Sequence, residues 1–207
     1  MEIAVLVFDD LTMLDAAGPL EVLARLPDAK VKIVAKDKGP LRAHKVSGGI
    51  GLIADHALSD VPSPDILLVP GGFGTRELAG DGTVTGWIGE VHRNTMWTAS
   101  VCTGALLLGA AGVLVGLKAT THWRAMDRLA GYGAIPTKER VVIDGKVITG
   151  AGVSAGIDMA LRLASMIAGD DYAQAIQLQI EYDPAPPFDA GHVDKVSQKV
   201  RDLLIPV

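Results

Sequence analysis

The chain has 207 residues, of which 49% are hydrophobic and 21% are charged, and its formal net charge is −5 at pH 7. A chain of this length can bury a full hydrophobic core, so we predict a single domain over residues 1–207. Its 19 basic residues are scattered, which argues against a nucleic-acid-binding surface. The uncharged run at 95–117 has the length of a membrane span, but its glycines and hydroxyl side chains indicate a buried strand followed by a buried helix.

The chain opens with a short apolar run at 2–8 that predicts a strand and lacks the basic and cleavage regions of a secretion signal. Together with the single cysteine, this favours the cytoplasm. A helix over about 15–26 and a strand over 31–35 complete a βαβ unit. Further apolar runs at 66–69 and 96–101 are typical of parallel strands covered by helices on both faces.

Turn signals divide the rest of the chain. Asp144-Gly145 lies between two β-branched runs and predicts a tight hairpin over 141–149. The glycine-rich stretch 46–53 predicts a small hairpin or an edge extension, and "YDPAPPFDAG" predicts an extended loop. Helices are expected at 83–93, 105–111, 124–129, 155–168, 172–180 and 193–203. The pattern as a whole predicts an α/β sandwich with a mostly parallel central sheet.

The only cysteine, Cys102, stands where the strand at 96–101 is expected to turn into a helix. Ligands of α/β proteins bind at the carboxyl ends of such strands. Gly104 and Ala105 are small enough for the sharp turn that presents a nucleophile, and the positive end of the helix would favour the thiolate. A cysteine is also often a small buried hydrophobic residue, so a nucleophile and a core residue stay open as alternatives.

A second loop at the same edge is expected after the strand at 66–69, where the sequence reads "PGGFGT". The backbone amides of Gly72 and Thr103 would form a pair of oxyanion donors for a reaction at Cys102. The alternative is a loop that needs glycine only for its unusual dihedral angles.

Asp15 follows the first strand among apolar neighbours, which raise the pKa of a carboxyl group and suit it to acid–base chemistry. Alternatively, Thr12 and Asp15 form a capping box at the start of the first helix. In that case Pro19 would clash with the carbonyl of Asp15, so neither interpretation is preferred at this point.

His122 is the histidine most suited to partner Cys102, because a short apolar connection brings it back toward the same edge. A histidine that simply packs beside Trp123 is the alternative. No histidine stands at metal-ligand spacing from another ligand, and no phosphate-binding glycine motif occurs. We therefore predict neither a metal nor a cofactor.

These segments together resemble the ThiJ/PfpI superfamily, which has the class I glutamine-amidotransferase-like fold, and within it an isonitrile hydratase-like subgroup. The resemblance rests on an ordered set of motifs: "LDAAGPLEVL", "DILLVPGGFGT", "SVCTGALLLGAAGVLVG", "ATTHWR", "GVSAGIDMAL" and "IEYDPAPPFDAG". It implies a flavodoxin-like three-layer sandwich with a nucleophile elbow, and a homodimer. No His-x-Glu pair is present, and Thr103 rather than histidine follows Cys102, so amidotransferase and peptidase activities lose support.

The resemblance also implies a role for each candidate residue. Cys102 matches the nucleophile of the family, Asp15 the acidic residue that hydrogen-bonds it, and the backbone of Gly72 and Thr103 the oxyanion donors. His122 would be an accessory residue. The implied reaction is hydration of an isonitrile, a small molecule, to an N-substituted formamide through a cysteine thioimidate, with no cofactor.

Two alternatives remain from the sequence. One is a glyoxalase or deglycase that acts on α-oxo aldehydes, and the other is a cysteine-based ligand or redox sensor. Sensory domains of this kind in transcription regulators precede a DNA-binding domain, for which we expect no room after Val207. Phe73, Trp123 and Tyr132 would line an apolar substrate pocket, or else pack in the core.

Overall fold

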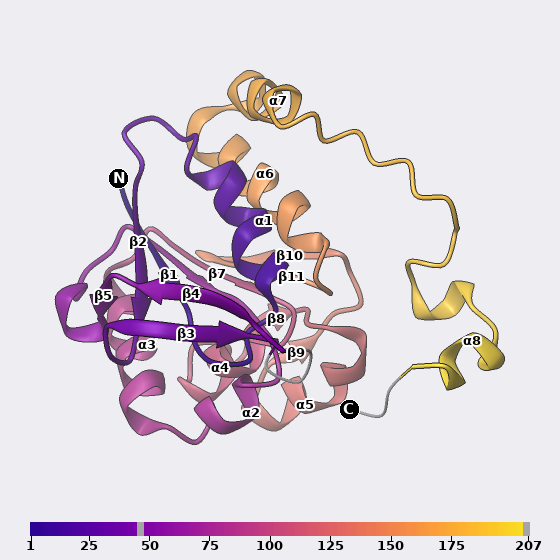
Figure 1. The fold of residues 1–207 in the computed structure, drawn as a ribbon, viewed down its shortest axis with the longest axis horizontal. Coiled ribbons are helices and arrows are strands. Elements are labelled where there is room, and N and C mark those ends of the chain that lie inside the picture. The colour runs from indigo at the N-terminus through magenta and orange to yellow at the C-terminus, as the bar shows by residue number, and fades with distance from the viewer. Residues whose placement is uncertain (45–47, 205–207) are drawn as a thin grey trace.

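In the computed structural model, which describes residues 1–44 and 48–204, a seven-stranded sheet forms the centre of the molecule (Figure 1). The strand order is β10-β11-β7-β6-β1-β2-β5, and every neighbouring pair is parallel except β10 and β11. The strands of this sheet are β1 (Glu2–Leu6), β2 (Lys30–Ala35), β5 (His56–Ala57), β6 (Ile66–Val69), β7 (Trp97–Val101), β10 (Val141–Asp144) and β11 (Val147–Gly150).

Helices cover both faces of the sheet (Figure 1). On one face lie α1 (Met13–Leu23) and α6 (Ala155–Ala168), with α7 (Asp170–Gln179) packed on α6. On the other face lie α2 (Thr75–Leu78), α3 (Gly82–Asn94), α4 (Gly104–Ala110) and α5 (Met126–Leu129). Short 3-10 turns occur at Leu58–Asp60, Trp123–Ala125, Ala130–Tyr132 and Val193–Lys195. The three-layer sandwich predicted from the sequence is therefore confirmed.

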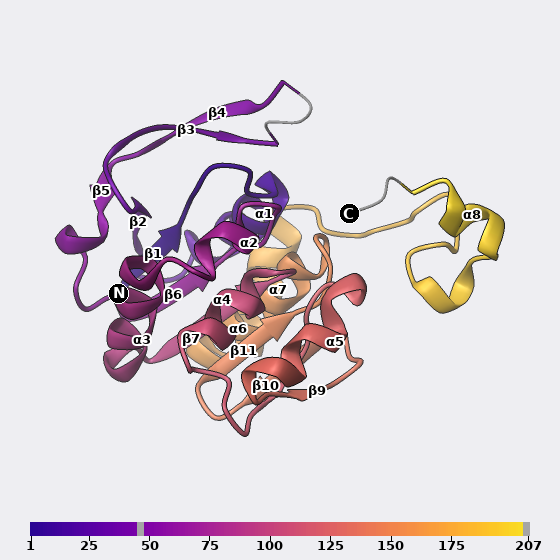
Figure 2. The same cartoon turned by 90° about the horizontal axis from the view of Figure 1, so that it is seen from below.

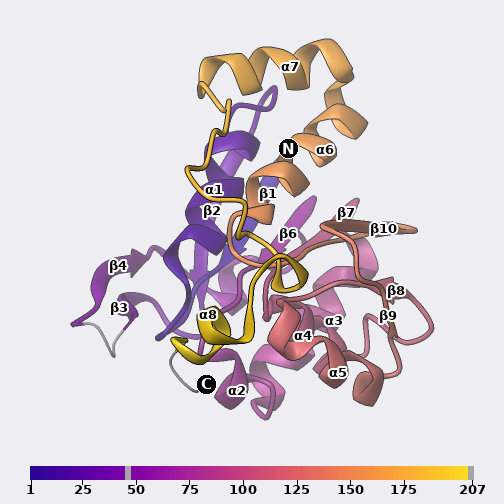
Figure 3. The same cartoon turned by 90° about the vertical axis from the view of Figure 1, so that its right-hand side faces the viewer.

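Two parts of the chain extend from this body. The hairpin of β3 (Gly39–Ala43) and β4 (Ile50–Ala54) stands off one edge (Figure 2). After α7, an extended segment runs down the length of the molecule to α8 (Gln198–Asp202) (Figure 3). We call residues 183–204 the C-terminal arm. A small parallel pair, β8 (Lys118–Ala119) and β9 (Ile135–Pro136), completes the secondary structure.

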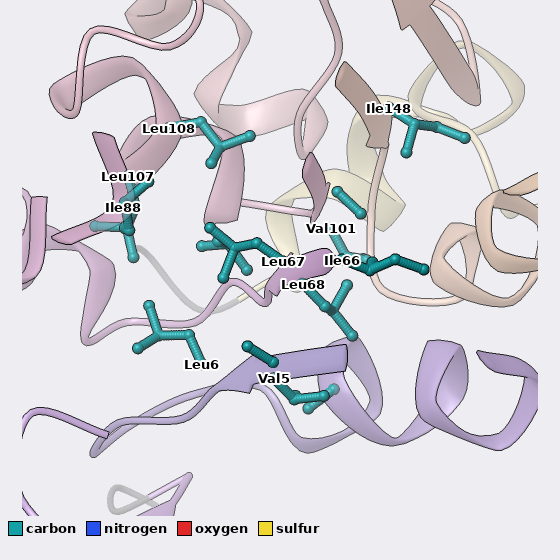
Figure 4. Close-up of a cluster of buried hydrophobic side chains, with 14 of the residues drawn as sticks. Val5, Leu6, Ile66, Leu67, Leu68, Ile88, Val101, Leu107, Leu108 and Ile148 are labelled. Carbon is teal, nitrogen blue, oxygen red and sulfur yellow. The ribbon is translucent and has the colours of Figure 1, made fainter. Parts of the chain in front are cut away.

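The core lies between the sheet and its two helical layers (Figure 4). All four residues of β6 are fully buried, because helices cover both faces of the sheet at this central strand. Leu107 and Leu108 of α4 and Ile88 of α3 are fully buried as well. Each such side chain contributes roughly 2 kcal/mol to the free energy of unfolding, so the apolar runs that predicted the strands also stabilise the sheet.

Close helix packing explains the course of α1, which was predicted at about 15–26. The helix begins at Met13 and ends at Leu23, with Pro19 inside it. The clash expected between Pro19 and the Asp15 carbonyl therefore did not prevent the helix from starting before Asp15. A Cβ added to Gly156 of α6 would lie 3.0 Å from the Pro19 ring. The missing side chain thus lets α6 pack against the proline, and this tertiary contact outweighs the lost helical hydrogen bond.

Other boundaries were predicted with mixed success. The tight hairpin at 141–149 is confirmed, with Gly145 at φ +58° in its turn. The small hairpin predicted at 46–53 exists, but its first strand lies earlier, at Gly39–Ala43, and residues 45–47 lie outside the described residues. The single helix predicted at 193–203 is wrong. Extended backbone at Val196 and Ser197 separates a 3-10 turn from α8, because an unpacked segment this short gains little from helix formation.

Within the described residues, no helix is both long enough and apolar enough to cross a membrane. The uncharged run at 95–117 is divided between β7 and α4, as the sequence indicated.

Candidate active site

Cys102 lies at the carboxyl end of β7 in a left-handed backbone conformation, with φ +56°. A residue with a side chain rarely adopts this conformation, which costs about 1 kcal/mol or more. Three hydrogen bonds hold it in place. The Cys102 amide donates to the carbonyls of Gly150 (3.1 Å) and Ala151 (2.7 Å), and its own carbonyl accepts from Thr121 Oγ1 at 2.6 Å. The predicted elbow is therefore present and is fixed by the loop that follows β11.

The elbow depends on glycines that leave room for the backbone. A Cβ on Gly104 would lie 2.1 Å from the Val69 carbonyl oxygen, so only glycine fits after the elbow. A Cβ on Gly71 would lie 2.5 Å from the Thr103 amide nitrogen and 2.9 Å from Asp15 Oδ2. The glycine turn after β6, the elbow and the first loop therefore meet at one point, as their positions in the sequence predicted.

Asp15 is fully buried in the first turn of α1. Its Oδ2 accepts the Gly71 amide at 3.0 Å, and its carboxyl group lies close enough to the Cys102 thiol for each group to shift the pKa of the other. Its Oδ1 is buried without a hydrogen-bond partner among the described residues. Thr12 is the N-cap residue, but its side chain makes no capping hydrogen bond. The capping-box alternative therefore does not hold, and Asp15 faces the cysteine instead.

Burial dominates the electrostatics of both groups. Desolvation raises the pKa of Asp15 from 3.8 to about 7, against smaller lowering effects of the Gly71 amide and the Cys102 thiol. This confirms the raised carboxyl pKa expected from the apolar neighbours. Desolvation, and then the charge of Asp15, raise the pKa of Cys102 to about 12.

The expected effect of the helix start on Cys102 is present, but it is outweighed. The Thr103 and Val153 amides hydrogen-bond the sulfur and lower its pKa, but they do not offset burial and the nearby carboxylate. With only seven residues, α4 adds little beyond these amides. At neutral pH the sulfur keeps its proton until a base removes it, and Asp15 is the base that the thiol contacts.

The backbone donors differ from the expected pair. The Gly72 amide donates to Thr103 Oγ1 at 2.9 Å, and Thr75 Oγ1 donates to the Gly72 carbonyl at 2.8 Å. The Gly72 amide thus bonds the side chain of Thr103 across the site, whereas the amides of Thr103 and Val153 face the sulfur. Sequence reasoning missed Val153. The available signal was that "GVSAG" follows a strand whose carboxyl end lies at the same edge.

His122 packs beside the elbow, against the loop that contains Gly152. Its Nδ1 accepts the Arg124 amide at 3.3 Å, and a Cβ on Gly152 would lie 3.1 Å from its ring. Burial, and then the charge of Arg124, lower its pKa. The structure thus places His122 over the loop that supplies Val153, and its accessory role stays a prediction.

The aromatic candidates for a substrate pocket separate into two groups. Phe73 and Trp123 are exposed by 52% and 41%, and Arg76 and Arg124 lie over their rings. Tyr132 instead packs against α4 at a position where Gly109 has no side chain. Throughout residues 1–44 and 48–204, no group of three or more His, Cys, Asp or Glu side chains could hold a metal ion.

Comparison with known proteins gives a consistent result. The DJ-1/PfpI family model matches residues 1–166. An isonitrile hydratase of Pseudomonas putida is 46% identical over 202 residues, which span 98% of this chain and 87% of that protein. The HTH-type transcriptional regulator CdhR of Pseudomonas aeruginosa is 31% identical over 176 residues, covering 83% of this chain and 51% of the regulator.

Solved structures agree with the fold. A ThiJ/PfpI family protein from Pseudomonas syringae superposes with a TM-score of 0.93 at 39% identity, covering 97% of this chain and 83% of that one. A match of that extent includes most of the C-terminal arm. Oxidized DJ-1 from Toxoplasma gondii superposes with a TM-score of 0.76 over 88% of this chain and 99% of that chain, at 24% identity. The latter likeness concerns the fold alone.

Proposed function

The chain belongs to the DJ-1/PfpI family, and from that premise we propose that it is an isonitrile hydratase with Cys102 as nucleophile and Asp15 as acid–base. The observation that carries the proposal is the meeting of fully buried Asp15 with the Cys102 elbow at Gly71, where a Cβ would lie 2.9 Å from Asp15 Oδ2 and 2.5 Å from the Thr103 amide nitrogen. A thiol that keeps its proton at neutral pH needs an adjacent base, and the terminal carbon of an isonitrile needs both a nucleophile and a proton.

In the first step, Asp15 takes the proton of the Cys102 thiol while the sulfur attacks the terminal carbon of R–N≡C. Asp15 then delivers that proton to the same carbon. The product is a thioimidate, R–N=CH–S–Cys102, in which one C–S and one C–H bond have formed. No net proton enters or leaves the site, so a closed, apolar environment suits the step.

In the second step, water adds to the C=N bond. Asp15 takes a proton from the attacking water and delivers it to the nitrogen, giving R–NH–CH(OH)–S–Cys102. The hydroxyl proton then passes through Asp15 to the sulfur as the C–S bond breaks. This releases R–NH–CHO and restores the thiol. The Thr103 and Val153 amides are placed to stabilise charge on the departing sulfur.

The assignment is tested by assaying the purified protein on cyclohexyl isocyanide and methylglyoxal in parallel, with Cys102→Ala and Asp15→Asn. Hydration of the isocyanide is expected for the native protein and should fall by at least about a thousandfold in each variant. Glu21→Gln, which removes an exposed carboxylate from the same helix, should leave the rate unchanged. Substantial hydration by either site variant would contradict the proposed roles.

The two alternative functions give different results in the same experiment. Turnover of methylglyoxal without hydration of the isocyanide would indicate a glyoxalase or deglycase. Absence of both activities, together with peroxide-dependent sulfenic or sulfinic acid on Cys102, would indicate a sensor.

We further propose that the enzyme is a cytoplasmic homodimer. A catalytic thiol must stay reduced, which suits a reducing compartment. Exposed apolar side chains on the hairpin and the arm support a second copy as their partner, among them Ile53, Phe188 and Leu203. Cell fractionation tests the compartment, and light scattering of the purified protein tests the dimer. A monomeric mass at micromolar concentration would exclude the dimer.

A further inference from the structure

One residue, His44, connects the β3–β4 hairpin to the helix that carries Asp15. It directly follows β3, and its Nε2 accepts the Met13 amide at 3.1 Å. Met13 is the first residue of α1, and Asp15 is two residues further on. We propose that His44 is a positioning residue: its imidazole Nε2 accepts the Met13 amide and fixes the first turn of α1 so that Asp15 faces the Cys102 thiol. The proposal rests on the proposed role of Asp15.

The first turn of α1 needs such an acceptor. A helix start leaves its first amides without intrahelical partners, and an N-cap side chain normally accepts one of them. Thr12 makes no such bond through its side chain. The imidazole of His44, which lies 31 positions further along the chain, therefore performs the capping for Met13. Losing this bond would leave a partly buried amide unpaired at the turn that positions Asp15.

The backbone of the hairpin is arranged for this contact. His44 has φ +50°, a left-handed conformation that is unfavourable for a residue with a side chain. Its amide donates to the Leu11 carbonyl at 3.3 Å, and the Asp10 amide donates to the Arg42 carbonyl at 2.8 Å. The Arg42 amide donates in turn to Asp9 Oδ1 at 2.8 Å. These bonds attach the loop before α1 to β3.

The other side of the same loop is attached to the glycine turn. The Thr12 amide donates to the Gly71 carbonyl at 2.9 Å, and Gly71 donates to Asp15. Asp15 thus lies between two attachments, the glycine turn on one side and the hairpin on the other. The bond from Met13 to His44 ends in a side chain outside the reacting groups, so it can be removed by substitution without changing Asp15 or Cys102.

His44→Leu and His44→Gln separate positioning from packing. Leucine fills similar space but accepts no hydrogen bond, whereas the Oε1 of glutamine can occupy the place of Nε2 and accept the Met13 amide. His192→Leu is the matched control, because His192 lies in the exposed arm, where its ring accepts only the nearby Asp194 amide. Cys102 reactivity is read from the rate of iodoacetamide alkylation as a function of pH, which requires no isonitrile substrate.

We expect two opposite changes in His44→Leu. Displacement of Asp15 removes a group that raises the pKa of Cys102, so alkylation at pH 8 should accelerate by about tenfold. The same displacement should lower kcat for hydration by about ten- to a hundredfold, with KM within about twofold of the native value, because His44 does not contact the substrate. His44→Gln should restore both readouts, and His192→Leu should change neither.

Several results would overturn the proposal. Native alkylation and native kcat in folded His44→Leu would do so, as would equal losses in folded His44→Gln and His44→Leu. If His44→Leu does not fold, a folded His44→Gln decides alone: native values support the acceptor role, and a lowered kcat contradicts it. If the protein hydrates no isonitrile, the alkylation profiles still test the placement of Asp15, so failure of the proposed function can be told apart from failure of this inference.

Discussion

At the scale of single residues, the site depends on how many protons Asp15 and Cys102 share. With pKa values of about 7 and about 12, the pair carries one proton between these limits and two below them. The one-proton state is the only one in which Asp15 can deprotonate the thiol. Burial raises both pKa values, so the lower limit of the one-proton state moves from 3.8 to about 7.

The pair predicts the pH dependence of catalysis. Below about pH 7 Asp15 is protonated and cannot accept the thiol proton, so kcat/KM for hydration should rise with pH and level off above an apparent pKa of about 7. The check is an initial-rate profile from pH 5 to 9. A kcat/KM that falls over this range as pH rises would contradict the assignment of Asp15 as base.

Asp15 also makes the folded protein less stable at pH values above 3.8, the ordinary pKa of an aspartate side chain. Its pKa is about 7 in the folded protein and 3.8 when exposed, so the folded state holds a proton that the unfolded chain releases between these values. Stability therefore falls as pH rises from 4 to 7, by up to about 4 kcal/mol at about 1.4 kcal/mol per pH unit.

Asp15→Asn removes this cost while keeping an acceptor for the Gly71 amide. We expect the variant to be more stable than the native protein at pH 8, by about 2–4 kcal/mol, and nearly equal to it at pH 4. Urea unfolding at the two pH values measures the difference. Glu21→Gln, on the exposed face of the same helix, should show no such pH-dependent gain.

At the scale of elements, apolar runs and turn residues predicted most of the sheet. The strands at β1, β2, β6 and β7 lie close to their expected ranges, because buried parallel strands show continuous apolar sequence. The hairpin strand β3 contains Arg42 and Pro40 and was missed, since it is half exposed and has no apolar run. Its link to α1 through His44 is a contact between distant segments, which the sequence does not encode locally.

The hairpin of β10 and β11 also stabilises α3 at a distance. Lys146 follows the predicted turn, and its Nζ donates to the carbonyls of His92, Arg93 and Thr95 at the C-terminal end of that helix. Charge-assisted hydrogen bonds to helix-terminal carbonyls and the helix dipole favour this arrangement. The tight turn could be predicted from the sequence, but the helix end that receives the lysine could not.

We expect Lys146→Met to lower the free energy of unfolding by about 1–3 kcal/mol, because three helix-terminal carbonyls lose a charged donor. The midpoint of urea unfolding, monitored by circular dichroism, measures the loss. Lys195→Met, which removes an exposed ion pair with Asp189 in the arm, is the matched control and should change stability by less than about 0.5 kcal/mol. Equal effects of the two substitutions would contradict the capping role.

At the scale of the whole molecule, the C-terminal arm makes few contacts with the folded body. The hydrogen bonds that residues 184–204 form with described residues lie within the arm. Tyr182, just before the arm, donates to Asp158 of α6. The arm exposes Phe188 by 76% and Leu203 by 78%. The sequence could not reveal this, since the same residues fit an amphipathic helix. That residues 1–207 form a single domain stays a prediction.

Deletion of residues 183–207 tests both the domain prediction and the proposed dimer. Residues 183–204 contribute no side chain to the core cluster, so the remaining body should keep its far-UV circular dichroism signal and a cooperative unfolding transition. If the arm binds a second copy, the native protein should be a dimer whose Tm rises with protein concentration, because association stabilises the folded state by mass action. The shortened protein should be a monomer by light scattering, with a Tm independent of concentration. A shortened protein that stays dimeric would place the interface elsewhere, and one that loses cooperative unfolding would make the arm part of the folded domain.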